Sequence, residues 1–346
     1  MNTINAAIVG ASGYTGAELV RLLINHPNVT ITAMTADRKA GMRMADVFPH
    51  LGGLNLPDLV KMDDVDWSNI DVCFCCLPHG TTQEFIASLP QNVRIVDLSA
   101  DFRLKDIEEY SKWYGDKHRA PELQKEAVYG LTEMKRDEIA KARLVANPGC
   151  YPTSAQLPLI PLLKEKKIGT QGIIIDSKSG ATGAGRAPKE GTLFCEVSDA
   201  IHAYGVGTHR HGPEIEQGLS EAAGENIFVS FTPHLMPMNR GILSTIYVTL
   251  ADNVSVNDIR TSLQNTYADE PFVRVVEEGN SPATRHVRGS NYCLIAVFAD
   301  RTPGRAIIVC VEDNVVKGAS GQAVQNMNVM FGFEETAGLT QQPMFP

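Results

Sequence analysis

Five short apolar runs in the first half of the chain constrain its fold more than any other feature. Helical or polar stretches separate them, and they span residues 6–9, 29–34, 72–77, 93–98 and 144–146. Each run ends in a cluster of glycine, proline or polar residues. Such a series is typical of βαβ units and predicts an α/β fold with a Rossmann-type, doubly wound parallel sheet. Ligands bind beyond the carboxyl ends of parallel strands, so we expect the five clusters to meet at one edge.

The second half of the chain has a different pattern, which begins near residue 149. Several of its β-type runs follow one another without a helix-length segment between them, at residues 173–175, 228–231, 242–250, 292–298 and 306–311. We therefore predict a second, α+β domain with a mixed, largely antiparallel sheet and helices on one face. From residue 319 the apolar side chains return to helical spacing. A length of 346 residues also fits two domains better than one.

Three glycines, Gly10, Gly13 and Gly16, lie between the first apolar run and the first helical pattern. Glycines in this position let the backbone turn tightly and approach a pyrophosphate, whose charge the helix N-terminal amides stabilise. The spacing departs from the common G-x-G-x-x-G, and the alternative is a simple strand-to-helix turn. The βαβ setting favours a dinucleotide site.

The end of the second run usually meets the adenosine ribose of a dinucleotide. Asp37 could accept a hydrogen bond from a ribose 2′-hydroxyl, whereas Thr35, Arg38 and Lys39 offer donors for a 2′-phosphate. The alternative for Arg38 and Lys39 is that they are solvated loop charges. We predict NADP as the cofactor.

One cysteine, Cys150, lies directly after the fifth apolar run and an Asn-Pro-Gly corner. If a helix starts there, its first amides and its dipole stabilise a thiolate, and Pro152 fits the first helical turn. Pro158 and Pro161 fit an uninterrupted helix badly, so we expect a short or kinked one. The alternative is a small residue that fills a gap beside a turn. We predict that Cys150 is a nucleophile.

Two histidines, His209 and His211, occur in "GTHRHGPE" together with Glu214. One histidine can transfer protons near neutral pH, and in an extended segment both would face the same side. A metal-binding pair is the alternative, but no further ligand cluster accompanies it, and we predict no metal. Arg103 and Arg186 are candidates to bind a carboxylate or phosphate, because a guanidinium can donate two parallel hydrogen bonds to such a group. An isolated arginine more often makes a salt bridge.

Charge and cysteine content limit the remaining classes of function. A formal net charge of −9 argues against nucleic acid or an anionic membrane as partner, and no apolar run approaches the roughly 20 residues of a membrane span. The N-terminus enters a strand pattern at once, so we expect no signal peptide. The seven cysteines form no disulfide or zinc framework, which favours a reducing cytoplasm. Apart from Cys150, they are expected to be buried, small core residues: Cys73, Cys75, Cys76, Cys195, Cys293 and Cys310.

Together these elements imply one class of reaction. A thiolate attacks an activated acyl group and expels a leaving group, which gives a thioester. Hydride from NADPH reduces the thioester to a thiohemiacetal, which collapses to an aldehyde. If the leaving group is phosphate, the arginines and the glycine-rich segment "SGATGAGR" have a role.

Eight segments of the chain resemble the N-acetyl-gamma-glutamyl-phosphate reductases of arginine biosynthesis. They are "GASGYTGAEL", "CLPHG", "SADFR", "NPGCYPT", "SGATGAGR", "HRHGPE", "PHLMPMNRG" and "DNVVKGASGQAVQNMN". The resemblance implies NADPH-dependent reduction of N-acetyl-L-glutamyl 5-phosphate to N-acetyl-L-glutamate 5-semialdehyde and inorganic phosphate by a cytoplasmic homo-oligomer, a dimer or tetramer. It implies an NADP-binding domain (1–149), onto which a C-terminal helix (317–346) packs back, and a catalytic and oligomerisation domain (150–316).

The resemblance also assigns residues, with Thr182 where serine is expected. The expected catalytic residues are Cys150 and the two histidines, His211 being our choice of acid/base because Gly212-Pro213 would fix its backbone. The expected cofactor-binding residues are Gly10, Ser12, Gly13, Tyr14, Thr15, Gly16, Thr35, Arg38, Pro78, Ser179, Gly180 and Asn314. The expected substrate-binding residues are Arg103, Asn147, Arg186 and Glu214.

The residues alone leave three other functions as alternatives. Aspartate-semialdehyde dehydrogenases use the same chemistry, but their cysteine lacks the "PGCYPT" continuation. Reductases of carrier-bound aminoadipyl or glutamyl phosphates would need extra basic residues for an acidic carrier. A dinucleotide sensor without catalysis would keep the glycine turn and would not need Cys150.

Overall fold

The computed structural model describes residues 3–345 and divides into two compact units. Unit 1 comprises residues 1–148 and 319–340, and unit 2 comprises residues 149–318 and 341–346. The expected first boundary, after residue 149, lies one residue beyond the observed one. The expected helix over 317–346 was wrong: α11 covers Gly321–Phe331 only. It ends because Gly332 adopts a left-handed conformation with φ of 67°, a common helix terminator.

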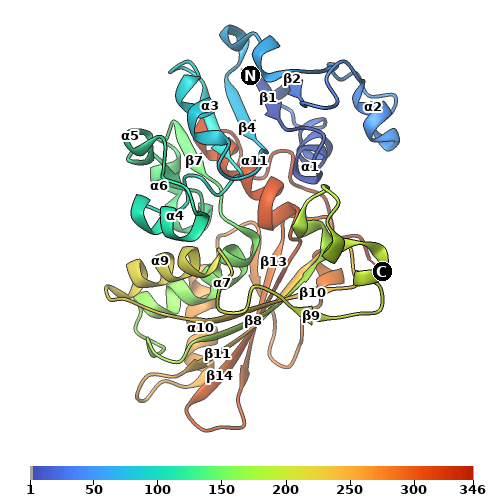
Figure 1. The fold of residues 1–346 in the computed structure, drawn as a ribbon. Helices are drawn as coiled ribbons and strands as arrows, with labels where there is room; N and C mark the ends of the chain where they lie inside the picture. The colour runs from blue at the N-terminus through green and yellow to red at the C-terminus, as the bar shows by residue number, and fades with distance from the viewer. Residues whose placement is uncertain (1–2, 346) are drawn as a thin grey trace. The chain divides into compact units, whose positions relative to one another are not determined.

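Unit 1 contains a seven-stranded sheet in which every pair of neighbouring strands is parallel (Figure 1). Its order is β3-β2-β1-β4-β5-β7-β6. This confirms the predicted doubly wound sheet, and the order reverses between β1 and β4, where ligands bind in such folds. The two-residue edge strands β3 and β6 were not predicted. The strands are β1 (Ile4–Val9), β2 (Val29–Thr35), β3 (Leu59–Val60), β4 (Val72–Cys75), β5 (Arg94–Asp97), β6 (Val128–Tyr129) and β7 (Leu144–Ala146).

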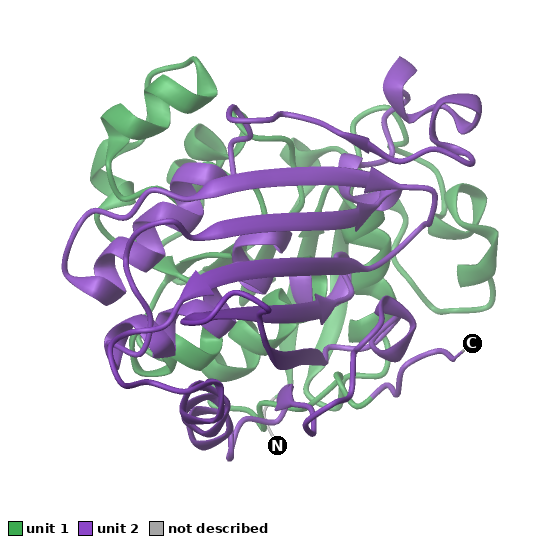
Figure 2. Cartoon of the chain, turned by 90° about the horizontal axis from the view of Figure 1, so that it is seen from below, with its two compact units in different colours: residues 1–148, 319–340 green, residues 149–318, 341–346 purple. Residues whose placement is uncertain are grey.

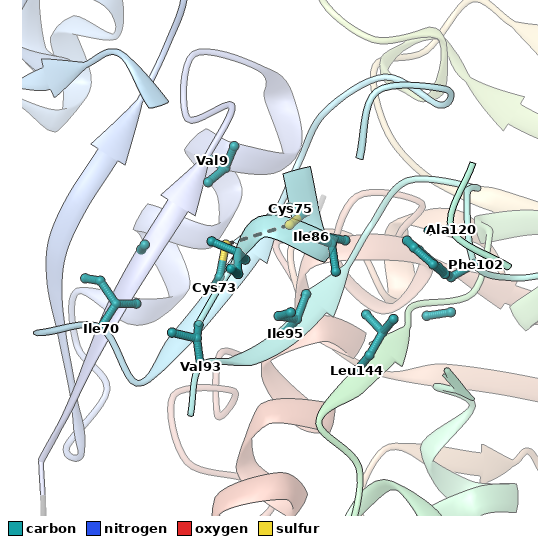
Figure 3. Close-up of a cluster of buried hydrophobic side chains, with 13 residues drawn as sticks. Val9, Ile70, Cys73, Cys75, Ile86, Val93, Ile95, Phe102, Ala120 and Leu144 are labelled. Atoms are coloured by element: carbon teal, nitrogen blue, oxygen red, sulfur yellow. Dashed lines mark hydrogen bonds between the residues drawn. The ribbon is translucent and has the colours of Figure 1, made fainter. Parts of the chain in front are cut away.

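The core of unit 1 includes the predicted cysteine strand (Figure 3). Cys73 and Cys75 are fully buried on β4, with their sulfur atoms 3.7 Å apart, because strand residues two apart share a face. Ile95 of β5 and Ile86 of α3 belong to the same cluster. The helices of unit 1 are α1 (Tyr14–Leu23), α2 (Met44–Val47), α3 (Thr82–Ser88), α4 (Ile107–Tyr114), α5 (Pro121–Gln124), α6 (Thr132–Ile139) and α11.

Side-chain amides attach α11 to the rest of unit 1. Gln322 and Asn326 both donate to the Gly130 carbonyl oxygen, at 3.0 and 2.8 Å, and Asn326 also accepts from the Thr132 hydroxyl at 2.7 Å. All three side chains are fully buried. These bonds explain why a buried helix carries so many glutamines and asparagines, since buried polar groups require partners.

Unit 2 contains a mixed seven-stranded sheet in the order β12-β13-β14-β11-β8-β10-β9. β8 and β10, and β12 and β13, are parallel, whereas the other four neighbouring pairs are antiparallel, as predicted. Figure 2 shows the long strands from a side on which no helix lies across them. The strands are β8 (Ile174–Gly180), β9 (His202–Ala203), β10 (Ser230–Met236), β11 (Ile242–Thr249), β12 (Val273–Val275), β13 (Cys293–Ala299) and β14 (Arg305–Glu312).

The longest helix of unit 2, α7, corrects one expectation. It runs for 15 residues, Cys150–Lys164, and continues through both Pro158 and Pro161, so it is not short. Pro161 cannot donate to the Leu157 carbonyl oxygen, and the hydroxyl of Tyr267 donates to it instead. A partner from outside the helix therefore satisfies the backbone group that the proline leaves free. The other helices of unit 2 are α8 (Phe194–Val197), α9 (Gly212–Ala223) and α10 (Val256–Thr266).

Most, but not all, of the cysteines lie as expected. Cys293 and Cys310 are buried on adjacent strands, but Cys195 is exposed on the four-residue helix α8. The prediction for Cys195 was wrong because its apolar neighbours Leu193 and Phe194 are themselves exposed. Within residues 3–345, no helix is long and apolar enough to cross a membrane.

Candidate active site

The glycine turn of unit 1 is built for close packing at both ends. A Cβ on Gly10, whose φ is 84°, would lie 2.6 Å from the Cys76 carbonyl oxygen, and a Cβ on Gly16 would lie 2.6 Å from the Ala11 Cα. Gly13 is the N-cap of α1 and provides no side-chain cap for its first amides. A Cβ there would meet only the Gly10 carbonyl oxygen, at 3.5 Å. Uncapped amides beside a bare backbone fit the pyrophosphate of a dinucleotide.

The predicted ribose-binding residues differ in exposure. Thr35 is buried, and its hydroxyl accepts a hydrogen bond from the Gly10 amide at 3.2 Å, so it stabilises the glycine turn. Arg38, with its neighbours Asp37 and Lys39, is exposed in the loop that follows β2. Of these residues, only the three exposed ones are accessible to a ligand. Ser12, Tyr14 and Thr15 lie at the turn and the start of α1.

A buried carboxylate fixes the loop that contains Pro78. Asp101, fully buried in "SADFR", accepts hydrogen bonds from the Gly80 amide at 2.6 Å, the Thr82 amide at 3.0 Å and the Tyr110 hydroxyl at 2.8 Å. Pro78 itself is exposed at the start of this loop. Sequence reasoning missed Asp101, although its position between two other polar residues after a strand was a usable signal.

Arg103 and Asn147 are both tied to the scaffold of unit 1. Arg103 is 8% exposed and donates to two backbone carbonyl oxygens, those of Asn147 and Leu98, each at 2.8 Å. These bonds connect the carboxyl ends of β5 and β7. The Asn147 amide donates to Ala319 and accepts from Asn326, both at 3.1 Å. Substrate binding by either residue stays a prediction.

In unit 2, Cys150 is the first residue of α7, as the sequence predicted. Gly149 caps the helix without a side-chain bond, and its amide donates to Glu214 Oε1 at 2.8 Å. Glu214 is 1% exposed, so a buried carboxylate holds the backbone immediately before the nucleophile candidate. A thiol at this position is favoured as thiolate by the helix amides and dipole.

The histidine pair lies beside the first turn of α7, in a different conformation from the one expected. His209 and His211 lie in a turn rather than an extended segment, and His211 is the N-cap of α9 with helical φ and ψ. Their rings still come together, with centroids 4.8 Å apart. The Tyr151 ring contacts both, at 5.6 and 5.8 Å. The extended conformation was wrong because Gly205 and Gly207 have positive φ, which curls the segment.

The two histidines have different surroundings. The rings of Tyr151, Tyr204 and Phe231 contact the ring of His209, with centroids at 5.6, 5.5 and 5.5 Å. Burial, and secondarily the charge of Arg210, lowers the pKa of His209 to about 4. His209 Nδ1 accepts from the His211 amide at 3.1 Å. His209 is therefore neutral near pH 7, with its proton on Nε2.

The remaining predicted residues of unit 2 fall into two groups. Ser179 and Gly180 end β8, and Asn314 lies after β14 with its amide accepting from the Gly241 amide at 2.7 Å and donating to Thr182 Oγ1 at 3.0 Å. Arg186 is exposed beyond the short 3-10 helix Ala181–Ala184. No group of three or more His, Cys, Asp or Glu side chains within residues 3–345 could hold a metal ion.

Family models match both halves of the chain. A model described as the NAD binding domain of semialdehyde dehydrogenase matches residues 5–142, and one described as the dimerisation domain of semialdehyde dehydrogenase matches residues 150–314. Among solved structures, aspartate semialdehyde dehydrogenase II from Vibrio cholerae aligns with a TM-score of 0.73 over 96% of this chain and 99% of that chain, at 16% identity. An aspartate semialdehyde dehydrogenase from Candida albicans, solved with NADP, aligns with a TM-score of 0.67 over 95% and 99%. The fold and the matched models define a semialdehyde dehydrogenase, an oxidoreductase with an NAD(P)-binding domain.

Curated relatives narrow this class. N-acetyl-gamma-glutamyl-phosphate reductase of Rhodospirillum rubrum is 67% identical over 99% of both chains. A probable chloroplastic N-acetyl-gamma-glutamyl-phosphate reductase of Oryza sativa subsp. japonica is 62% identical over 99% of this chain and 83% of that one. The chain belongs to the N-acetyl-gamma-glutamyl-phosphate reductase family, as the sequence motifs indicated.

Proposed function

We propose that the protein reduces N-acetyl-L-glutamyl 5-phosphate with NADPH, giving N-acetyl-L-glutamate 5-semialdehyde and phosphate, as a step of arginine biosynthesis. The substrate follows from the names of the relatives. The observation that carries the chemistry is the position of Cys150 at the start of α7, whose first turn lies beside a buried carboxylate and two imidazoles.

The side chains of unit 2 supply the covalent steps. The Cys150 thiolate attacks the acyl carbon, and the carbon–oxygen bond to the phosphate breaks. Phosphate departs, and the acyl group remains bound to Cys150 as a thioester. The bound nicotinamide cofactor supplies a hydride to the thioester carbon. His211 donates a proton to the oxygen of the resulting thiohemiacetal and removes it again as the carbon–sulfur bond breaks, which releases the aldehyde and the thiolate.

We assign the acid/base role to His211 and an orienting role to His209. A histidine with a pKa of about 4 is almost entirely neutral at pH 7 and is a poor proton donor there. Its Nδ1 is also occupied by the His211 amide, which fixes the backbone from which His211 projects. Glu214 acts as a positioning residue through the Gly149 amide.

The phosphate of the substrate needs cationic or amide donors. Arg186 is exposed and follows a glycine-rich segment, so its guanidinium is accessible to the phosphate of a ligand. Arg103, in contrast, already holds two backbone carbonyl oxygens. We therefore expect substitution of Arg186 to raise the KM for the acyl phosphate, and substitution of Arg103 to destabilise unit 1 as well.

NADP is the proposed cofactor in preference to NAD. Exposed Arg38 and Lys39 can pair with a 2′-phosphate, and one structural relative was solved with NADP. Arg38→Ser should lower the ratio of kcat/KM for NADP to that for NAD by about tenfold or more, the effect of one charge-assisted bond. A wild-type ratio that favours NAD would show that Asp37 determines the preference.

We also propose a cytoplasmic homo-oligomer in which the uncovered face of the unit 2 sheet meets a second copy. Residues of β11 alternate between fully buried and half-buried, with Leu243, Thr245 and Tyr247 on the half-buried face. The free state of the seven cysteines fits a reducing compartment. Light scattering should give at least a dimer, and Thr245→Glu should reduce its mass; a monomeric wild type would contradict the proposal.

Two measurements test the reaction. Purified protein with NADP and phosphate should oxidise N-acetylglutamate 5-semialdehyde and leave aspartate semialdehyde largely unused. Cys150→Ala should keep the fold and NADP binding but lose activity by several orders of magnitude. Preference for aspartate semialdehyde would overturn the substrate, and substantial turnover by Cys150→Ala would overturn the mechanism.

A further inference from the structure

Three hydrogen bonds connect the glycine-rich segment of unit 2 with the turn between β10 and β11. The Asn314 side-chain amide accepts from the Gly241 backbone amide at 2.7 Å and donates to Thr182 Oγ1 at 3.0 Å. The Thr182 hydroxyl in turn donates to the Asn239 carbonyl oxygen at 2.6 Å. Asn314 follows β14, and Thr182 belongs to the 3-10 helix Ala181–Ala184. We call these three hydrogen bonds the amide relay.

The two ends of the amide relay fix its direction. A backbone N–H can only donate, so the Gly241 amide requires Asn314 Oδ1 as its acceptor. A backbone carbonyl oxygen can only accept, so Asn239 takes the Thr182 proton, and the Thr182 oxygen accepts from Asn314 Nδ2. The Asn314 amide therefore has one orientation that satisfies the relay, with its nitrogen toward the glycine-rich segment.

Backbone bonds hold the segment itself in place. Three consecutive backbone amides of the segment donate to carbonyl oxygens of residues 238–241 at 2.9–3.2 Å, those of Gly180, Ala181 and Thr182. These bonds do not involve the Thr182 hydroxyl. Its loss would instead remove the acceptor of Asn314 Nδ2, whose residue is only 3% exposed to water. The hydroxyl thus acts on the orientation of the amide more than on the position of the segment.

The amide nitrogen lies beside a point that a ligand can reach. A Cβ on Gly183 would lie 3.6 Å from Asn314 Nδ2 and 3.4 Å from Ser179 Oγ, and Gly183 is exposed. Asn314 Nδ2 carries two protons, of which Thr182 takes one. The other proton can be donated to a carbonyl oxygen of a ligand at this point.

We propose that Thr182 is a positioning residue, which holds the Asn314 amide in the orientation that binds the nicotinamide half of the cofactor. The nicotinamide carries a carbonyl oxygen that such an amide can bind. Thr182 raises the fraction of the protein whose amide is ready to donate, and the apparent affinity scales with that fraction. The inference rests on the proposed NADP-dependent reaction and on cofactor binding by Asn314.

Calorimetric titration with NADP tests the proposal without turnover. Thr182→Val keeps the shape and removes the acceptor of a buried amide, so it should raise the Kd for NADP about tenfold. Thr182→Ser keeps the hydroxyl and should stay within about twofold of wild type. The ligand 2′,5′-ADP lacks the nicotinamide half, so its Kd should be the same in wild type and Thr182→Val. Adding Thr182→Val to Asn314→Ala should raise the Kd for NADP no further, because Thr182 acts through Asn314.

Thr192→Val is the matched control. The Thr192 hydroxyl also donates to a backbone carbonyl oxygen, that of Lys189 at 3.0 Å, but it is not part of the amide relay, so this variant should bind NADP as wild type does. Equal NADP affinity in wild type and Thr182→Val overturns the proposal. So does an equal loss in Thr182→Ser and Thr182→Val, or a weaker affinity of Thr182→Val for 2′,5′-ADP, since either result indicates a general change in packing. Failure of the proposed reaction is separate, because it is measured as turnover by Cys150→Ala and as the preferred aldehyde.

Discussion

At position 318, the absence of a side chain lets the segment after β14 pass directly against Cys150. A Cβ on Gly318 would lie 2.7 Å from Cys150 Cβ, 3.1 Å from Cys150 Cα and 2.9 Å from Glu312 Oε1. Gly318 belongs to a π-helical turn, Val316–Ser320, a conformation often found at functional sites. Sequence inspection offers no such contact, because residues 150 and 318 meet only through the fold of unit 2.

Gly318→Ala should therefore displace Cys150. The alanine has no backbone penalty here, but its methyl group overlaps backbone and side-chain atoms of Cys150, so we expect a loss of roughly 1–3 kcal/mol in stability. We expect kcat to fall at least tenfold with little change in the KM for NADP. Gly191→Ala, where a Cβ would meet nothing within 4 Å, is the matched control. Wild-type kcat in Gly318→Ala would show that the site tolerates the shift.

The histidine assignment predicts different pH–rate profiles for two variants. His211→Gln should lose the titration near neutrality and about a hundred- to ten-thousand-fold in rate. His209→Asn keeps an acceptor for the His211 amide, so it should retain that titration with a smaller loss in kcat. The roles are reversed if His209→Asn is the variant whose profile becomes flat.

Burial of His209 also predicts a pH-dependent stability. The folded state keeps this imidazole neutral down to about pH 4, whereas the unfolded chain protonates it below about 6.5. Between these values the unfolded state binds more protons, so the free energy of unfolding falls as pH falls, by up to about 3 kcal/mol. Urea unfolding of His209→Asn should show a shallower decrease than wild type from pH 6.5 to 4. Parallel curves would contradict a buried, neutral His209.

At the scale of the element, helix α7 combines an active-site first turn with two internal prolines. The helix is buried along most of its length, and apolar packing keeps it continuous where local propensity disfavours it. Its free carbonyl groups have to be satisfied by other parts of unit 2, as Tyr267 does for Leu157. The helix is thus stable only in its tertiary context.

Removal of the Tyr267 hydroxyl should destabilise α7 selectively. Tyr267→Phe keeps the buried ring and leaves the Leu157 carbonyl oxygen without the donor that Pro161 cannot replace, so we expect a loss of about 1–3 kcal/mol in urea unfolding. Tyr292→Phe, whose hydroxyl bonds to the exposed side chain of Gln342, should change stability far less. Equal stabilities for the two variants would show that Leu157 finds another donor.

For the molecule as a whole, unit 2 is largely an insertion within the sequence of unit 1. Residues 149–318 lie between the first 148 residues and the segment 319–340, which completes unit 1. The ends of the insertion are adjacent, since the Asn147 amide donates to the Ala319 carbonyl oxygen at 3.1 Å. Helix α11 then fills unit 1 with buried amides that bond to Gly130 and Thr132.

Unit 1 should therefore fold without unit 2 only if α11 is retained. Joining residues 1–148 to 319–340 through about four Gly/Ser residues, a reach of up to about 14 Å, should give a cooperatively unfolding protein that binds NADP. Residues 1–148 alone should not, because Gly130 and Thr132 lose their partners. Fluorescence reports this directly, since both tryptophans, Trp67 and Trp113, lie in unit 1. Equal cooperativity of the two fragments would contradict a structural role for α11.

Local patterns in the sequence determined the parallel sheet, the mixed sheet, the glycine turn and the start of a helix at Cys150. Each depends on spacing or on residues within one turn, which a linear pattern contains. The family motifs likewise indicated the family that the comparisons establish.

Long-range packing determined the burial and the hydrogen-bond partners of the predicted site residues. Thr35, Arg103 and Asn147 carry groups suited to ligands, yet their hydrogen bonds go to the backbone or to buried amides of unit 1. The low pKa of His209 arises from burial among rings contributed by α7, the segment after β9 and β10. Burial and the partner of a polar group depend on which elements pack together, and only the tertiary structure specifies that.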